Sequence, residues 1–331
     1  MKDDTRTADV LDKIYQRILT QLQQTITTQN TLYPILTQLC IKAQLQDKAV
    51  PLACLPIWGY LAVGGEEPTQ AVPVAAAWRC LHLAGKLLND VAKHASDPYL
   101  PLVSPAERLN AGVALTFLAQ LILTDGSKCE IPDTLVLKFH ADFAHTGLQA
   151  AAGQQFQLEK NDEWSLEKYE TVVAQRSGMP FALALRTGAQ LATKHANDTP
   201  HVQALADCGY QLGMMIQLAD DFNGVWSPVG CSDLVVKSYS WPLLYAQTLA
   251  DEACVQELQM LLKNAPEDPR AESQVREIMT TLGVPVVLVM ESEKHRQLAE
   301  AALFSLPDSS ARHLLLEMVQ RLCLLPQTNQ S

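Results

Sequence analysis

The sequence predicts an all-α protein, a single-domain helical bundle of about ten to eleven helices. Apolar residues recur at steps of three and four over most of the chain, which is the spacing of one helix face. Runs that alternate apolar and polar residues, as half-buried strands do, are hard to find. Proline and glycine separate the helical segments by short connections. A bundle of this kind holds its ligand sites in its interior.

The first helix is the clearest element. Its apolar face consists of seven residues, Val10, Leu11, Ile14, Tyr15, Ile18, Leu19 and Leu22. Pro34 then suits the first turn of the next helix, where its missing N–H costs nothing. Further helices are predicted over residues 72–93, 109–123, 135–158, 165–195, 199–223, 233–248, 252–263, 270–282, 284–304 and 309–324.

The length of 331 residues would allow two domains. No linker rich in proline, glycine or serine divides the chain, however, so we expect one domain over residues 1–331. Within it we expect an N-terminal helix (1–30), a cavity-forming bundle (31–248) and C-terminal helices (249–331).

Composition excludes several classes of protein. The net charge is −11 and no basic stretch offsets it, which argues against nucleic acid as a partner. The eight cysteines form no CxxC pair or zinc spacing and are typical of buried thiols in a reduced cytosolic protein. The most apolar uncharged stretch, Leu109 to Thr124, has 16 residues. A membrane-spanning helix needs about 20, so we expect no transmembrane segment and a cytoplasmic protein.

Two adjacent carboxylates, Asp220 and Asp221, end a long apolar helix. Adjacent acids repel each other and are costly to desolvate, so a metal or a cationic partner explains them better than packing does. Oxygen ligands without a nearby histidine or cysteine favour Mg²⁺. The alternative is that the pair marks a hydrated helix end.

The segment after this pair carries a resemblance. The chain resembles the polyprenyl synthase family, the trans-isoprenyl diphosphate synthases, which carry G-x-x-F-Q-x-x-D-D-x-x-D followed by D-x-x-x-G-K-x-T-x-P. The matching residues occur in the same order, as Gly213, Gln217, Asp220, Asp221, Lys237 and Pro242. Gly224 stands where the last Asp is expected, Val236 replaces the glycine, and the spacing around Lys237 differs by one.

Other motifs of the family have counterparts earlier in the chain, so the resemblance spans nearly its whole length. The segment from Asn89 to Lys93 occupies the place of the first D-D-x-x-D motif, Gly153-Gln154 that of G-Q, and Arg176-Ser177-Gly178 that of K-T-[AG]. The resemblance implies a class I isoprenoid synthase fold around a central apolar cavity. It also implies Mg²⁺ as cofactor and an allylic prenyl diphosphate as substrate.

The first acidic motif has lost its metal ligands. In the family its first and fifth carboxylates, one turn apart on one helix face, hold Mg²⁺ against the diphosphate. Here these residues are Asn89 and Lys93, and Asp90 points about 100° away from Asn89. We therefore expect fewer ions than the three typical of the family. Lys86 and Lys93, two turns apart, could neutralise a diphosphate directly. Alternatively, these lysines and Asp90 form an ordinary exposed charge stripe.

The acceptor site of the family is also altered. Leu32-Tyr33-Pro34 stands where the family has the basic motif R-x-R-P, and only Arg108 lies near the place of its Arg-Arg-Gly run. Two anionic substrates together need concentrated positive charge. We therefore expect no ordinary chain elongation with isopentenyl diphosphate.

The motifs that are kept and those that are altered together predict a function and a set of site residues. We expect a non-standard enzyme that binds and ionises an allylic prenyl diphosphate, for terpene formation or for prenyl transfer to an acceptor other than isopentenyl diphosphate. The alternatives are a non-catalytic subunit of a heteromeric prenyl diphosphate synthase and an isoprenoid- or lipid-binding protein. The resemblance implies a homodimer or a heterodimer with a related synthase. The expected residues are Asp220, Asp221, Lys237 and Arg176 for catalysis, Gln217, Lys86, Asn89, Asp90, Lys93 and Gln154 for substrate binding, and Asp220 and Asp221 for Mg²⁺.

Overall fold

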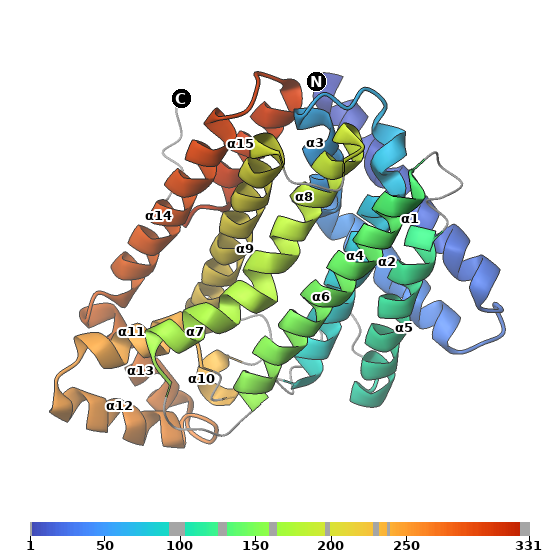
Figure 1. Cartoon of the computed structure of the whole chain (residues 1–331). Coiled ribbons are helices and arrows are strands. Elements are labelled where there is room, and N and C mark those ends of the chain that lie inside the picture. Colours follow the sequence, from blue (N-terminus) through green and yellow to red (C-terminus); the bar gives the residue numbers. More distant parts are fainter. Residues whose placement is uncertain are drawn as a thin grey trace.

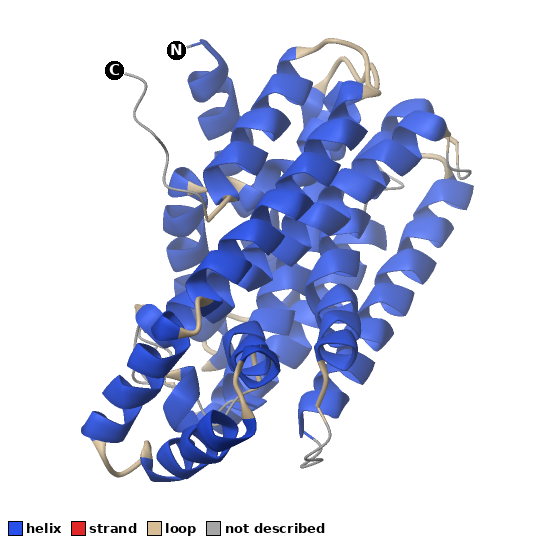
Figure 2. Ribbon diagram, turned by 90° about the vertical axis from the view of Figure 1, so that its left-hand side faces the viewer, coloured by secondary structure: helices blue, strands red, loops and turns tan. Residues whose placement is uncertain are grey.

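The computed structural model describes residues 2–92, 103–124, 131–158, 164–195, 199–227, 232–236 and 239–324. Within these ranges every regular element is helical and no strand occurs, which confirms the predicted all-α class (Figures 1 and 2). The α-helices are α1 (Lys2–Thr25), α2 (Leu32–Ala49), α3 (Leu55–Ala62), α4 (Val72–Ala92), α5 (Pro105–Thr124), α6 (Asp133–Leu158), α7 (Leu166–Val173), α8 (Met179–Thr193), α9 (Pro200–Trp226), α10 (Asp233–Val236), α11 (Trp241–Leu249), α12 (Glu252–Asn264), α13 (Pro269–Thr281), α14 (Val284–Phe304) and α15 (Ser310–Leu322).

The described part of the chain has more helical segments than the ten or eleven predicted, because long predicted helices are divided. The segment predicted over 165–195 contains α7, a π-turn (Ala174–Gly178) and α8. The segment predicted over 233–248 consists of α10 and α11, and Pro242 lies in the first turn of α11. The proline- and glycine-broken region before residue 65 holds α3, with Pro56 in its first turn.

Helices α8 and α9 run side by side through the middle of the bundle (Figure 1). α8 also packs against α3, and α9 against α14, so both are covered on two sides. The buried side chains form two clusters. The larger includes Tyr15, Trp78 and Phe139, and the smaller surrounds Tyr169 and Trp241 at the end of α9.

Two glycines let α9 touch the chain of α8. A Cβ atom on Gly209 would lie 2.4 Å from the backbone oxygen of Phe181, and one on Gly213 would lie 2.3 Å from the backbone oxygen of Ser177. Only glycine allows such an approach. Residues four apart share a helix face, so Gln217 and Asp221 continue the same row over the π-turn.

A buried ionic network joins α1, α2 and α4. The Nε atom of Arg79 lies 2.9 Å from Oδ2 of Asp47 and donates at 3.0 Å to the Tyr15 hydroxyl oxygen. That hydroxyl donates to Asp47 at 2.5 Å. Arg79 also contacts Nδ1 of His82 at 2.7 Å, and a guanidinium can only donate, so this ring nitrogen is the acceptor. Breaking such a pair by removing one partner costs about 3–5 kcal/mol, so the network holds the first helices in register.

Helix α5 combines a partly buried face with an exposed apolar stripe. Among the described residues it is the one helix whose length and composition would allow it to cross a membrane, a test that core helices of soluble proteins also pass. Its exposed large side chains are Leu109, Val113, Phe117 and Leu121, at steps of four. This row leaves one apolar face of α5 without a covering helix in the described structure.

We predict opposite effects for two glycine-to-alanine substitutions. Gly213→Ala should lower the free energy of unfolding by about 1–3 kcal/mol, because its Cβ would overlap the Ser177 backbone. Gly85→Ala, in α4 with no atom within 4 Å of the added Cβ, should raise it by about 0.4–1 kcal/mol. Urea denaturation of both variants checks this. Equal effects would show that α8 and α9 do not touch at Gly213.

Candidate functional site

Arg176 lies in the π-turn between α7 and α8. π-turns within helices occur frequently at functional sites. The Arg176 guanidinium donates from Nη2 to Oδ1 of Asn89 on α4 at 2.5 Å, and from Nη1 to Oε1 of Gln157 on α6. Three helices therefore meet at one partly buried cation, and both of its partners are neutral amide oxygens.

Gly153 on α6 makes room for this arginine. A Cβ atom there would lie 3.0 Å from Cγ of Arg176 and 3.1 Å from Oε1 of Gln175. Gln157, one turn after Gly153, accepts a hydrogen bond from Arg176, whereas the residue predicted to bind substrate was Gln154. Gln154 lies beside Gly153 on α6 and is partly buried, but Arg176 bonds to Gln157. The one feature of the sequence that could have indicated Gln157 is its spacing of four residues from Gly153, which places both on one face of α6.

The charge of Arg176 is incompletely compensated. Burial lowers the pKa of its guanidinium, and the negative charges of Asp221 and Asp90 partly oppose this shift. An arginine stays protonated in proteins even so. The interior of the described bundle thus contains a positive charge that no directly bonded carboxylate neutralises.

A chain of hydrogen bonds runs from the π-turn along α9. The Ser177 hydroxyl donates to Oε1 of Gln217 at 3.1 Å, and Nε2 of Gln217 donates to Oδ1 of Asp221 at 2.7 Å. Oδ2 of Asp221 accepts from the Tyr169 hydroxyl at 2.7 Å and from the Trp241 backbone N–H at 3.0 Å. Asp221 therefore joins α7, α9 and α11, and the sequence alone indicated neither Tyr169 nor Trp241.

The two adjacent carboxylates differ in environment. Asp221 is 1% exposed and accepts three hydrogen bonds, whereas Asp220 lies exposed on α9. Burial raises the pKa of the Tyr169 hydroxyl well above its usual value, and the Asp221 charge adds to this, so Tyr169 stays a donor. A carboxylate has about four acceptor positions. Three of these positions on Asp221 are taken by the donors named above.

The two acidic motifs differ in the groups that they offer to Mg²⁺. At the first motif, the Asn89 oxygen is turned to Arg176, and an amide bonded to a guanidinium does not fit a divalent cation. At the second, Asp220 offers the oxygen ligand that Mg²⁺ prefers. Over the described residues, no group of three or more His, Cys, Asp or Glu side chains could hold a metal ion by itself.

Gly224 on α9 lies beside the carboxylate of Asp233. A Cβ atom there would lie 2.3 Å from Oδ2 of Asp233, which comes from α10 and is 9% exposed. A side chain at 224 would require this carboxylate to shift, and an aspartate there would also repel it. Lys237, predicted to follow the acidic pair, lies outside the described residues, as does Lys93 of the first motif.

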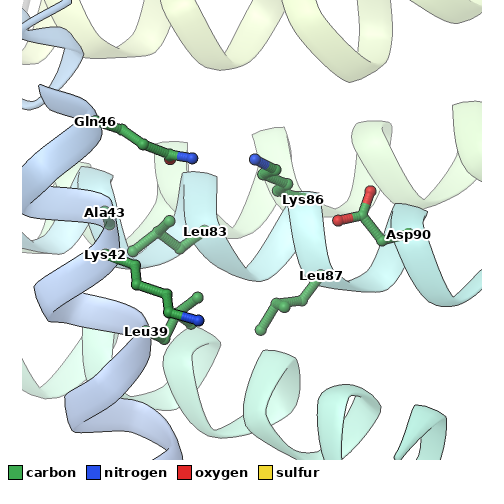
Figure 3. Close-up of a pocket in the computed structure, with 8 residues that line it drawn as sticks. All are labelled: Leu39, Lys42, Ala43, Gln46, Leu83, Lys86, Leu87 and Asp90. Carbon is green, nitrogen blue, oxygen red and sulfur yellow. The ribbon is translucent and has the colours of Figure 1, made fainter. Parts of the chain in front are cut away.

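The predicted binding residues of α4 lie on two different faces. Asn89 reaches Arg176, whereas Lys86 and Asp90 line a recess between α4 and α2 (Figure 3). In Figure 3 the Gln46 amide and the Lys86 ammonium group point toward each other across it. Its volume is about 20 Å³, room for roughly one water molecule. The lining residues are Leu39, Lys42, Ala43, Gln46, Leu83, Lys86, Leu87 and Asp90.

We predict that the neighbouring aspartates contribute differently to stability. Asp221→Asn should lower the free energy of unfolding by about 1.5–3 kcal/mol, because it weakens three hydrogen bonds to a buried charge. Asp220→Asn, at an exposed position, should change it by less than about 0.5 kcal/mol. Chemical denaturation followed by circular dichroism measures both, and a large loss in Asp220→Asn would contradict the assignment.

Comparison with known proteins places this arrangement in a family. No curated protein sequence matches the chain. Several solved structures match it over nearly its whole length. Geranylgeranyl pyrophosphate synthetase from Pyrococcus horikoshii Ot3 gives a TM-score of 0.79 at 18% identity, covering 98% of both chains. Geranylgeranyl pyrophosphate synthase from Lactobacillus brevis gives 0.79 at 17% identity, covering 95% of this chain and 96% of the other.

A third structure, a decaprenyl diphosphate synthase from Rhodobacter capsulatus, gives a TM-score of 0.76 at 20% identity, covering 97% of this chain and 98% of the other. At these identities the likeness shows the fold, which is the isoprenoid synthase bundle that the resemblance implied. The polyprenyl synthetase family model matches residues 103–282, more than half of the 331 residues. This segment includes Arg176, Gln217 and both adjacent aspartates, and the chain belongs to the polyprenyl synthetase family.

Proposed function

We propose that the chain binds an allylic prenyl diphosphate in the interior of the bundle and ionises it. The bond between the allylic carbon and the diphosphate oxygen breaks, and the electron pair leaves with the diphosphate. The observation that carries this proposal is the Arg176 guanidinium, partly buried and bonded only to neutral oxygens among the described residues. A cation held in this way favours an anionic ligand.

Each remaining residue of the site has a role in this proposal. Arg176 binds the diphosphate by charge-assisted hydrogen bonds and stabilises the charge that develops as it leaves. Asp220 would hold Mg²⁺, a cofactor general in this family, which when bound would share that neutralisation. Gln217, bonded to both Ser177 and Asp221, presents a fixed amide dipole. Asp221 is a positioning residue because its carboxylate is already bonded.

We propose further that the carbocation bonds to an acceptor without a diphosphate, which loses a proton, or cyclises internally and then loses a proton. The start of α2 carries Leu32, Tyr33 and Pro34, which provide no cation for a second diphosphate. Arg108, which stands alone near the expected basic run, is only 6% exposed. Two diphosphates close together would need more positive charge than these positions offer.

Pairing with a second copy, or with a related synthase, is the partner that we propose. The exposed apolar stripe of α5, defined above, supports this, since monomers rarely expose long rows of large apolar residues. α6, which packs against α5, also exposes large apolar residues, among them Leu137 and Leu148. A heterodimer would also suit the non-catalytic alternative, in which an intact synthase supplies the activity.

We predict that the purified chain releases diphosphate from an allylic C10, C15 or C20 diphosphate with Mg²⁺ and without isopentenyl diphosphate. Arg176→Met should slow release at least about 100-fold, and Asp220→Asn at least about 10-fold, because each removes charge stabilisation of the leaving group. Removal of Mg²⁺ by EDTA should also slow release. A colorimetric diphosphate assay measures the rate.

The control for this assay is Asn264→Asp, at the exposed end of α12, which should keep the wild-type rate. No release at any chain length would contradict an ionising enzyme. A pull-down that then recovered an intact synthase would favour the non-catalytic subunit.

We also predict that Phe117→Glu weakens self-association. Phe117 is 66% exposed on α5, and a buried charge at a dimer interface should raise the dissociation constant at least about 10-fold. Met290→Glu, at a 65% exposed position of α14, is the matched control and should not change it. Analytical ultracentrifugation measures both constants. A wild-type chain that is monomeric, even when mixed with a related synthase, would contradict the pairing.

A further inference from the structure

Arg176 differs from four other arginines of the described structure, which form ion pairs. Arg79 pairs with Asp47, Arg276 with Glu272, Arg296 with Glu293 and Glu300, and Arg312 with Asp308. Arg176 instead donates to the side-chain amides of Asn89 and Gln157. These four cations are each paired with a carboxylate, whereas the side-chain hydrogen bonds of Arg176 go to neutral amide oxygens.

The geometry leaves hydrogen-bonding capacity on this guanidinium. It has five N–H donors in a rigid fork, of which Asn89 takes one on Nη2 and Gln157 one on Nη1. The remaining donors suit bidentate binding of a phosphate group. The two amides come from α4 and α6, so they fix the fork from two sides while adding no charge.

The neutrality of residue 89 matters because of where it stands. It occupies the first position of the acidic motif that in this family binds metal, and its oxygen lies 2.5 Å from Nη2 of Arg176. An aspartate there would form an ion pair with the guanidinium and cancel the charge offered to a ligand. Asp90, the next residue, lines the recess with Lys86 on another face of α4. The loss of the carboxylate at residue 89 and the absence of an ion pair on Arg176 are therefore one change.

We propose that Asn89 and Gln157 are positioning residues that make Arg176 a metal-independent binding site for the diphosphate group. The identity of the ligand rests on the function proposed above, whereas the independence from metal rests on the arrangement of these three side chains. In this site direct contact with the guanidinium replaces the carboxylate and metal bridge at the first acidic motif. A metal at Asp220 then serves turnover, and binding does not require it.

The test is calorimetric titration of the full chain with inorganic pyrophosphate in EDTA and, separately, in Mg²⁺. We expect binding in EDTA, with an affinity within about threefold of that in Mg²⁺. Arg176→Met should abolish binding in EDTA. Asn89→Asp should weaken it at least about 10-fold, because it neutralises the cation. Asn89→Ala, which loses the same hydrogen bond without adding charge, should weaken it only about threefold.

Two controls separate this effect from damage to the fold. Asn264→Asp adds the same charge at the end of α12, a helix that packs against α13, and should leave pyrophosphate binding unchanged. Thermal unfolding of each variant shows that it is folded. If residue 89 had only a structural role, Asn89→Asp and Asn89→Ala would weaken binding equally.

Pyrophosphate binding that requires Mg²⁺, or equal affinity in EDTA for the wild type and Asn89→Asp, would overturn the proposal. The result is separable from that of the enzyme assay. Binding in EDTA without diphosphate release from any allylic substrate would leave this inference standing and remove the proposed function. Release in Mg²⁺ without binding in EDTA would do the reverse.

Discussion

Contact between the backbones of α8 and α9 determines where the polar side chains of the site can lie. Gly209 and Gly213 bring α9 against the residues that form and follow the π-turn. Because helix faces repeat at steps of four, Gln217 and Asp221 then meet Ser177 and Tyr169. Any added atom at Gly213 would push the two helices apart. The hydrogen-bond chain depends on their close approach at this residue.

Burial of the Asp221 carboxylate is possible only because its donors come from three directions. An isolated buried carboxylate is very costly, but here a phenol, an amide and a backbone N–H replace water. These donors belong to α7, α9 and α11, which all contribute residues to the smaller hydrophobic cluster. The hydrogen bonds of Asp221 thereby connect this cluster to the end of α9. The neighbouring Asp220 lies at the surface.

At two positions where a motif residue of the family is replaced in this chain, another side chain of the structure lies close by. Gly224 lacks a carboxylate where that of Asp233 already lies. Asn89 lacks a charge where Arg176 approaches within hydrogen-bond distance. In both places the missing acid would meet a group that now occupies or uses its position. The altered motifs are thus consistent with one rearranged site, because each loss is matched by a neighbouring contact.

The sequence by itself determined the helical class, since its apolar residues repeat at steps of three and four over most of the chain. It also placed Gly213, Gln217 and Asp221 on one face, because a helix relates residues four apart without any tertiary information. The sequence did not predict where the long helices are divided, at the π-turn and before α11, because the conformation of short elements depends on their neighbours.

Only the tertiary structure decided which partners those faces meet. Asn89 and Arg176 are 87 positions apart, and Tyr169 and Asp221 are 52 apart, so no local spacing relates them. The same holds for Gln157 and for the pairing of Asp47 with Arg79. The division of the predicted α4 residues between the interior and the α2 recess followed from how the helices pack. A sequence records the order of side chains along a helix, whereas burial and charge compensation depend on which helices lie beside it.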